Sequence, residues 1–434
     1  MFLVEYGRMT VKMRIFSSQG IFFQFCRRGQ IGATTALILV LLIISLSSAK
    51  AIELRGNIFS EFYGYKELGL NHYRPYAGMR ANLGIWRGEK SRALELNTYF
   101  RWTTDLKTKS STDPQTFFYD TYLHLANVPA RSHIYIGRQF VYNGAGSLLM
   151  DGIRAKYIII PQAQIELFGG SAVSSAEPEK IRNISDFGSF GGRLAISPAG
   201  STKFGLNLLS RRLDGYGEIN RAAVDAEQVI SRWRLFGRAA YNLTRSSMAE
   251  LLGRISFQPP QWYFEGEFLW REPSVSDNTV FSIIDYYRYC EFRLNGRRTI
   301  IKNLNLDARV TGTLYDNENA WNFQIGLIGS WYNIGWRHQT GYGGVNDGLV
   351  LLLNLRLNSR WETYAAANVG RYKVQKEQPT RNDAYSSQAG ILWRPITGLT
   401  ARIEGQYLRN AIMTEETRIY IKLAKDFSFF DSRK

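Results

Sequence analysis

The stretch that decides the fold is "NLNLDARVTGTLYDNENAWNFQIGLIGSW", residues 303–331. Apolar or small residues occupy alternate positions from Leu304 to Leu314, and polar residues lie between them. Turn-forming residues fill positions 316–319, and the alternation resumes from Trp321 to Leu327. This pattern predicts a β-hairpin with one apolar and one polar face.

Most of the chain after Ile52 repeats this alternation. It is clear in the ranges 52–59, 77–85, 94–102, 233–241, 262–270, 349–357 and 419–429. The pattern predicts about 22 strands of roughly 10–13 residues, with 18 or 20 as the alternatives if some joins are misread. Polar connections at 107–115, 174–186 and 373–383 are expected to be surface loops. No domain boundary and no long helix is indicated.

The N-terminal region predicts export. A short apolar run, "ATTALILVLLIISL", follows Arg27-Arg28 and precedes the small residues Ala49 and Ala51. This order is typical of a signal peptide, and a membrane-spanning helix would need about 20 apolar residues. We therefore expect residues 1–51 to be a signal peptide cleaved after Ala51, with an uncleaved anchor as the alternative. Residues 52–434 would form one β domain.

Cysteine usage agrees with a chain that has no internal disulfide. Of the two cysteines, Cys26 precedes the apolar run and would be lost on cleavage, so Cys290 would remain alone. We expect Cys290 to be a free thiol at a lipid-facing strand position. No Cys-x-x-Cys-His sequence is present, which excludes covalently attached haem.

The long strands favour a membrane barrel over a soluble sandwich. Sandwich strands are usually about 5–6 residues long, whereas tilted strands of about 9–11 residues cross a bilayer. The polar face carries more charged residues than a dry core could pair, so lipid is expected on the apolar face and water on the polar face. An open sheet edge cannot be left in hydrocarbon. The sequence therefore predicts an all-β protein, a single closed antiparallel transmembrane β-barrel.

Tryptophan positions support the same interpretation. Tryptophans concentrate near the ends of the apolar stripes, where aromatic girdles of a barrel meet the lipid headgroups. These residues are Trp102, Trp233, Trp262, Trp270, Trp321, Trp331 and Trp393.

The chain is strongly basic, with a formal net charge of +17. Of its 54 basic and 37 acidic residues, six and one precede Ile52, which leaves +12 for residues 52–434. Basic side chains on the water-facing side predict an anion-selective lumen. For any single residue, the alternative is an ion pair with an acid on a neighbouring strand. The strongest candidates for pore-lining basic residues are Arg154, Lys156, Arg232, Arg234, Arg238, Arg309, Arg356 and Arg402.

Catalytic and cofactor motifs are not found in the sequence. The four histidines have no metal-ligand spacing, and no nucleophile elbow, phosphate-binding glycine loop or zinc motif occurs. Asp120 and His124 share one polar strand face, which favours a solvated pair on the wall, with a catalytic acid–base pair as the alternative. We expect no enzyme, no cofactor, no metal site and no nucleic-acid partner.

The C-terminal segment carries a family resemblance. "TRIYIKLAKDFSFF" (417–430) would be the closing strand, rich in aromatic residues. With the alternation and the signal peptide, it resembles Gram-negative outer-membrane β-barrels, particularly porin-like and alginate-export-like barrels. The run "YIGRQFVYNGAGSLLMDGIRAKY" (135–157) also resembles a strand–turn–strand unit of such porins.

The resemblance implies a location in the outer membrane of a Gram-negative bacterium and passive passage of small anionic or polar solutes. Implied partners are outer-membrane lipid and lipopolysaccharide, the barrel-assembly machinery and a second copy of the chain. The alternatives are a sheath around a periplasmic multihaem cytochrome, an exporter of an anionic polysaccharide, an outer-membrane enzyme and a soluble adhesin.

Overall fold

The computed structural model describes residues 53–67, 69–109, 113–174, 177–213, 217–272, 288–316, 318–373, 379–411 and 415–430. The expected signal peptide and Cys26 lie outside these residues. The described chain contains a four-residue helix, α3 (Ile184–Phe187), and 22 strands. The strands are β1 (Glu53–Glu67), β2 (Leu70–Arg87), β3 (Ala93–Thr103), β4 (Gln115–Ala126), β5 (Ser132–Asn143), β6 (Gly146–Ile160), β7 (Ala163–Ala172), β8 (Gly188–Ala199), β9 (Thr202–Leu213), β10 (Gly217–Ile230), β11 (Trp233–Asn242), β12 (Ser247–Phe257), β13 (Trp262–Arg271), β14 (Tyr289–Ile301), β15 (Leu304–Tyr315), β16 (Asn319–Gly329), β17 (Tyr332–Gly341), β18 (Val345–Arg356), β19 (Trp361–Lys373), β20 (Asn382–Trp393), β21 (Leu399–Arg409) and β22 (Glu416–Phe430).

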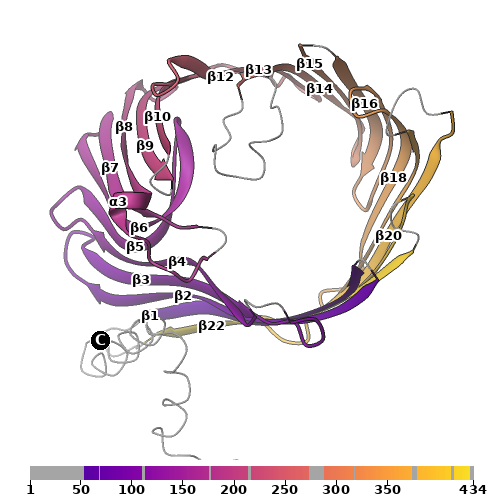
Figure 1. The fold of residues 1–434 in the computed structure, drawn as a ribbon, viewed down its shortest axis with the longest axis horizontal. Helices are drawn as coiled ribbons and strands as arrows, with labels where there is room; N and C mark the ends of the chain where they lie inside the picture. The colour runs from indigo at the N-terminus through magenta and orange to yellow at the C-terminus, as the bar shows by residue number, and fades with distance from the viewer. Residues whose placement is uncertain are drawn as a thin grey trace, which may run out of the picture. The chain divides into compact units, whose positions relative to one another are not determined.

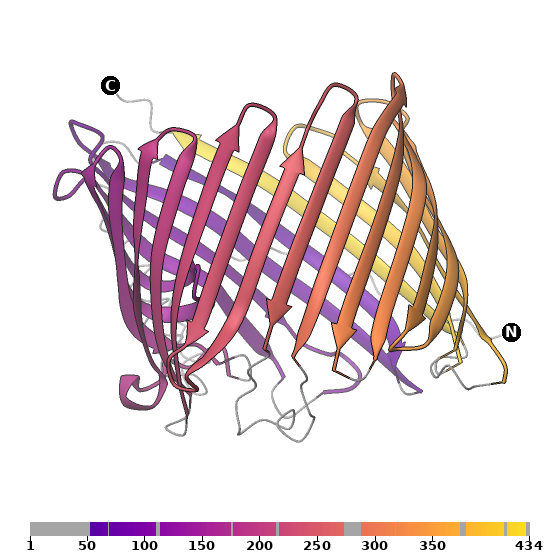
Figure 2. The ribbon, with the colours of Figure 1, turned by 90° about the horizontal axis from the view of Figure 1, so that it is seen from above.

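The strands close into a single antiparallel barrel. Each strand pairs with the next one along the chain, and β22 returns to pair with β1 from Glu53↔Phe430 to Gly64↔Ile419. Figure 1 shows the resulting ring, and Figure 2 shows the tilt of the strands. The predicted closed β-barrel of about 22 strands is confirmed. Some strands exceed the predicted 10–13 residues, and β2 has 18, because pairing with neighbours extends them beyond the apolar stripe.

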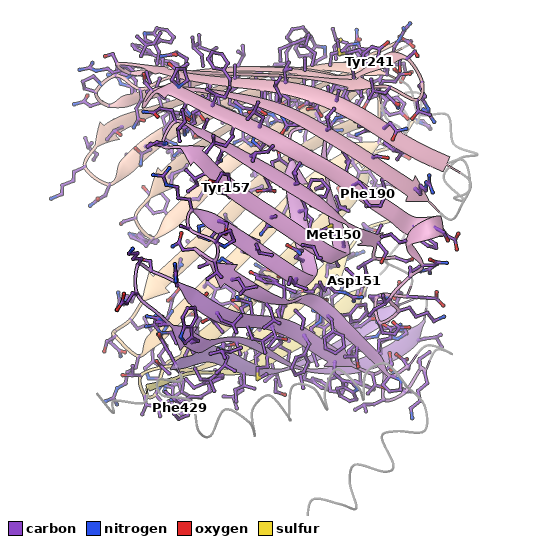
Figure 3. All side chains as sticks on the ribbon, turned by 90° about the vertical axis from the view of Figure 1, so that its left-hand side faces the viewer. Met150, Asp151, Tyr157, Phe190, Tyr241 and Phe429 are labelled. Carbon is purple, nitrogen blue, oxygen red and sulfur yellow. The ribbon has the colours of Figure 1, made fainter. Side chains whose placement is uncertain are left out.

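The outer face of the barrel is apolar. In β9, Leu206 and Leu208 are 55% and 58% exposed, whereas Asn207 between them is only 2% exposed on the inner side. Figure 3 marks four outward aromatic side chains, Tyr157, Phe190, Tyr241 and Phe429, all of them exposed. An apolar surface on every side of a closed barrel requires lipid around it, because contact of this surface with water would cost a large free energy.

Aromatic side chains mark both membrane interfaces. Trp233, Trp262 and Trp361 open their strands at one end of the barrel, and the Trp361 ring stacks on the Trp393 ring with centroids 5.5 Å apart. Trp102 is the penultimate residue of β3, at the opposite end. Rings at both strand ends form the girdles that the sequence predicts.

The two ends of the barrel differ in the length of their connections. At the end where β1 begins, the turns are short, and only two residues join β6 to β7 or β10 to β11. At the other end lie the connections 104–114, 173–187 and 374–381, which match the three predicted loops. In outer-membrane barrels, short turns face the periplasm and long loops face outward. The chain is thus an outer-membrane β-barrel in which β1 begins and β22 ends at the periplasmic end.

Two smaller expectations can be compared with the structure. Cys290 is a free cysteine in β14, and its register partners Trp270 and Leu314 lie on the apolar outer face, as expected. Among the described residues, no helix is long and apolar enough to span a membrane.

Candidate functional site: the lumen and its inward hairpin

The β5–β6 hairpin leaves the barrel wall and bends into the lumen. β4 pairs with β3 along its whole length, but it pairs with β5 only from Thr121↔Arg138 to Ala126↔His133. Beyond Arg138, β5 pairs with β6 alone on its way to the tip. Figure 1 shows this hairpin inside the ring, beside β9 and β10. The run 135–157 is therefore a strand–turn–strand unit as predicted, but its distal half lies inside the barrel rather than in the wall.

A row of glycines makes the bend possible. Gly137 of β5 has a φ of 129°, which residues with a side chain rarely adopt. Its partner across the ladder is Gly152, which faces Gly170 of β7. A Cβ atom on Gly152 would lie 2.2 Å from the Gly169 carbonyl oxygen, so β6 and β7 approach this closely only without side chains.

The hairpin tip is docked on the inner face of β8, β9 and β10 by polar contacts. The Asn143 Nδ2 atom donates to the Leu208 carbonyl oxygen (3.0 Å), and the Gly144 amide donates to Asn207 Oδ1 (3.0 Å). Asn207 is held in turn by Arg193 and Asp225, which form an ion pair at 2.7 Å. The tip therefore meets a preformed, hydrogen-bonded site on β8, β9 and β10.

Apolar packing fills the space between the hairpin and this wall. Val141 and Met150 are fully buried, and they belong to one cluster with wall residues. The complete cluster contains Val141, Ala145, Leu148, Met150, Phe168, Leu209, Ala223, Ala240 and Ala249. An entirely water-facing inner side, which the alternation predicts, is thus wrong at the hairpin. The sequence pattern could not reveal this difference because a bent hairpin and a straight one alternate alike.

Arg138 closes the corner where the hairpin departs from β4. Its guanidinium binds both carboxylate oxygens of Asp151 at 2.7 and 2.6 Å and is only 6% exposed. The same guanidinium donates to the carbonyl oxygens of Phe118 in β4 (3.3 Å) and of Pro178 in the loop after β7. Arg138 therefore donates a hydrogen bond to a backbone carbonyl oxygen of β4, where the inward course of the hairpin leaves β4 without a partner strand. Backbone groups without hydrogen bonds would be costly in a membrane.

On β11–β14, four arginines of the inner wall form ion pairs with two glutamates. Glu250 binds Arg238 and also Arg271 (2.6 Å), and Glu267 binds Arg254 and also Arg293 (2.9 Å). Here the alternative to an anion-selecting role holds, namely an ion pair with an acid on a neighbouring strand, because each carboxylate lies between two guanidiniums.

On β1–β6, arginines of the inner wall instead lie against aromatic rings. The Arg80 guanidinium lies 4.4 Å from the Tyr99 ring centre, and that of Arg154 lies 4.1 Å from the ring of Tyr135. The Nε atoms of Arg101 and Arg154 are buried without a hydrogen-bond partner. Arg80, Arg101 and Arg154 thus contact aromatic rings and form no ion pair among the described residues.

The eight predicted pore-lining residues do not form a single ring. Arg232 lies in a periplasmic turn, Arg234 is the second residue of β11, and Arg356 ends β18, so all three are at the periplasmic rim. The remaining five lie within strands. Arg154 and Lys156 share the inner face of β6, Arg238 binds Glu250 and the Tyr142 hydroxyl, Arg309 binds the Asn295 side chain, and Arg402 binds Glu404 and Tyr364.

The proposed Asp120–His124 pair has a different arrangement. The His124 Nε2 atom lies 3.1 Å from His133 Nδ1, its Nδ1 atom lies 3.5 Å from Glu95, and its ring stacks on Tyr135. No contact joins His124 to Asp120 among the described residues. In the same part of the chain, no group of three or more potential ligands could hold a metal ion.

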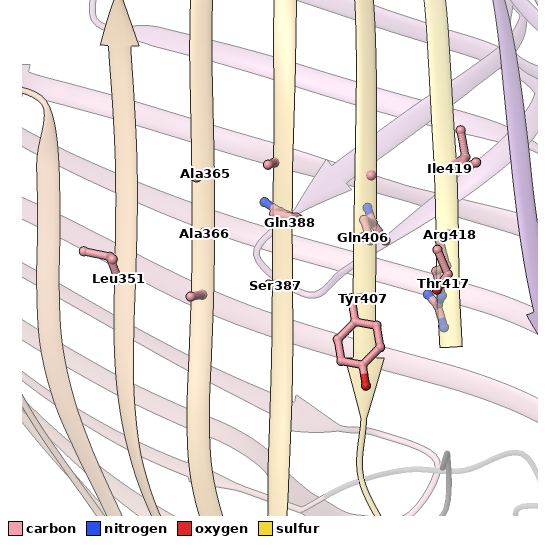
Figure 4. Close-up of a pocket in the computed structure, with 13 residues that line it drawn as sticks. Leu351, Ala365, Ala366, Ser387, Gln388, Gln406, Tyr407, Thr417, Arg418 and Ile419 are labelled. Atoms are coloured by element: carbon pink, nitrogen blue, oxygen red, sulfur yellow. The ribbon is translucent and has the colours of Figure 1, made fainter. Parts of the chain in front are cut away.

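The outer wall also carries a shallow depression of about 450 Å³ on β18–β22. It arises because the outward residues Ala365, Ala367, Ala389 and Gly405 are small, and Tyr407 borders it (Figure 4). This depression faces the membrane and is separate from the lumen.

Comparisons with known proteins give remote structural likeness. No protein-family model matches the chain, and no curated protein matches it. Among solved structures, the translocation pore of the P pilus usher PapC has 8% identity and a TM-score of 0.47, covering 87% of this chain and 99% of that chain. Pseudomonas aeruginosa OpdK with vanillate has 8% identity, a TM-score of 0.43 and the same coverage. A BenF-like porin from Pseudomonas fluorescens has 7% identity, a TM-score of 0.41 and the same coverage. The barrel of this chain is established by its own strand pairing.

Proposed function

We propose that this protein is a porin-like channel that passes small hydrophilic solutes across the outer membrane, with a preference for anions. The observation that carries the proposal is the inner face of a closed barrel, which is polar and charged while the outer face is apolar. A water-filled lumen of this kind conducts by size exclusion, and an excess of basic groups lowers the barrier for anions.

The inward hairpin supports a channel with a limited aperture. On the side of the hairpin that faces away from its buried cluster, Phe140 and Tyr142 are 55% and 60% exposed. The Arg238 guanidinium of the inner wall donates a hydrogen bond to the Tyr142 hydroxyl. The hairpin thus occupies part of the lumen. A sheath around a folded cytochrome would need that space, so the channel is the function that we favour.

Planar-bilayer recording of the refolded barrel tests this proposal. We expect discrete conductance steps in KCl, and a reversal potential in a KCl gradient whose sign reports chloride preference. A barrel that inserts without conducting would contradict the channel, and a cation-selective reversal potential would contradict the anion preference alone.

A further inference from the structure

The inner wall formed by β2 and β3 carries two arginines that no acid neutralises. The Arg80 guanidinium lies over the ring of Tyr99, and the Arg101 guanidinium lies 4.8 Å from the ring centre of Tyr76. Neither arginine takes part in an ion pair among the described residues. The buried Nε atom of Arg101 also has no hydrogen-bond partner. This contrasts with the matched arginines of β11–β14.

The strand register brings the two arginines close together. Arg80 is opposite Tyr99, and Arg101 is opposite Gly78, so the two arginines are diagonal neighbours on one face. Diagonal neighbours on paired strands are about 7–8 Å apart, within reach of long side chains. Both guanidiniums can therefore contact one small ligand in the lumen.

Aromatic stacking determines which surface the arginines offer. The Tyr119 ring stacks on Tyr99 with centroids 4.7 Å apart, and Phe117 stacks on Tyr119 at 6.1 Å. Arg101 also lies within 6.0 Å of Phe117 and Tyr119. The faces of the rings are covered by other rings and by guanidiniums. The groups left to contact a solute are the guanidinium N–H groups and the phenol hydroxyls. Guanidiniums that lie against rings present donors suited to oxyanions.

The next cation along the wall is already neutralised. Lys422 of β22 lies 5.0 Å from the Phe59 ring centre and forms an ion pair with Glu61 at 2.7 Å. A Cβ atom on Gly78 would lie 2.3 Å from the Phe59 ring, so Gly78 lets this ring lie beside the two arginines. On this part of the inner wall, the charges of Arg80 and Arg101 thus remain without an ion pair among the described residues.

We propose that an arginine–tyrosine cluster in the lumen is a binding site for a doubly charged oxyanion, the phosphate or sulfate group of a small solute. The cluster consists of Tyr76, Arg80, Tyr99, Arg101, Phe117 and Tyr119. Two unpaired guanidiniums match a dianion in charge, whereas a carboxylate would neutralise only one of them. This inference deepens the proposed channel function and rests on it.

Calorimetric titration of the detergent-solubilised barrel tests the site, with inorganic phosphate, sulfate and acetate as probes. We expect phosphate or sulfate to bind more tightly than acetate. Substitution of Arg80→Gln or Arg101→Gln should each weaken dianion binding about ten- to hundredfold, as expected for a lost charge-assisted hydrogen bond. The variant Arg101→Lys keeps the charge but loses the planar donor, so it should bind with intermediate affinity.

Arg297→Gln is the matched control. It removes the same charge from β14, where Arg297 pairs with Asp307 at 2.9 Å and is about half exposed. The control should bind phosphate like the unchanged protein. Heat-dependent gel migration verifies that each variant is a folded barrel. Unchanged dianion binding in the folded double variant Arg80→Gln/Arg101→Gln would overturn the site, as would an equal loss in the control.

Conductance measurements on the same samples test the proposed binding site and the proposed channel function independently. A double variant that still conducts KCl but is no longer blocked by phosphate supports both proposals. Unchanged phosphate block in a conducting double variant refutes the site and leaves the channel intact. Phosphate binding that depends on both arginines in a barrel that never conducts refutes the channel and keeps the site.

Discussion

Single arginines have different roles in this barrel, depending on whether they have acidic partners. Arg138 is one arginine among many in the sequence, yet its burial and its contacts with Asp151, Phe118 and Pro178 give it a structural role. Arg80 and Arg101 are equally ordinary in the sequence, but their surroundings leave them unpaired. The difference lies in the neighbours, which come from other strands.

Replacement of Arg138 should destabilise the barrel. Arg138→Ala would leave Asp151 buried without a partner and expose the edge of β4, and breaking a buried ion pair costs about 3–5 kcal/mol. Urea unfolding in detergent or lipid measures the change. The exposed pair of Arg297 and Asp307 provides the comparison, because Arg297→Ala should cost only about 0–1 kcal/mol. Equal effects of the two substitutions would contradict this role of Arg138.

Asp105 should make one extracellular loop sensitive to acid. Its carboxylate is fully buried, lies 2.7 Å from His72 Nδ1 and accepts hydrogen bonds from the amides of Lys107 (3.0 Å) and Thr108 (2.9 Å). Burial raises the pKa of this carboxyl, but the amides of Thr108 and Lys107 and the side chains of His72 and Arg74 together hold the pKa below its ordinary value. The carboxylate therefore stabilises the loop above about pH 4, and this stabilisation is lost as the pH falls further.

A spin label reports this loss. Leu106, which is 61% exposed, can be labelled as Leu106→Cys in a Cys290→Ser background. The label should gain mobility progressively as the pH falls from about 4 to about 2. In an Asp105→Asn variant, the label should already be mobile at neutral pH and should respond little to acid. A label that stays equally immobile in both proteins would refute the role of Asp105.

At the level of secondary structure, the hairpin formed by β5 and β6 is the element that departs from a regular barrel. Its bend requires Gly137 and Gly152, and its tip requires the site of Arg193, Asn207 and Asp225 on β8, β9 and β10. The same run of sequence could also have continued in the barrel wall as a regular strand pair. Its inward course is selected by burial of Val141 and Met150 against the wall.

Filling the hinge should release the hairpin and enlarge the pore. A side chain in Gly152→Val would collide with the Gly169 carbonyl oxygen, so β6 could not keep its approach to β7 at the bend. We expect a higher single-channel conductance, or larger conductance fluctuations, than in the unchanged protein. Gly253→Val is the control, because no atom lies within 4 Å of its Cβ position. An unchanged conductance in a folded Gly152→Val barrel would contradict a hairpin that narrows the lumen.

For the whole molecule, closure is the condition for stability in lipid. β22 covers the free edge of β1 over twelve residue pairs, and neither edge could be left without hydrogen-bond partners in hydrocarbon. Closure also creates the two environments, lipid outside and water inside, that the alternating sequence requires.

Removal of β22 should therefore prevent assembly. A chain ending before Glu416 would expose the edge of β1, and we expect it to remain protease-sensitive and not to show heat-dependent gel migration. Ile421→Val, which keeps every backbone hydrogen bond and the apolar outer face, should assemble normally. A protease-resistant barrel without β22 would show that closure by this strand is not required.

The sequence by itself determined the strand character and the apolar outer face, because both follow from local period-two alternation and from the thickness of a bilayer. It placed the strand number at 18 to 22, and the pairing in the structure decided 22. It also indicated the end positions of tryptophans such as Trp233 and Trp262. Only the tertiary structure decided that the run 135–157 bends inward, that Arg238 is neutralised by Glu250, and that Arg80 and Arg101 are not neutralised. These outcomes depend on which side chains meet between strands and between the hairpin and the inner wall, and such contacts join residues far apart along the chain, as Asn143 joins Leu208.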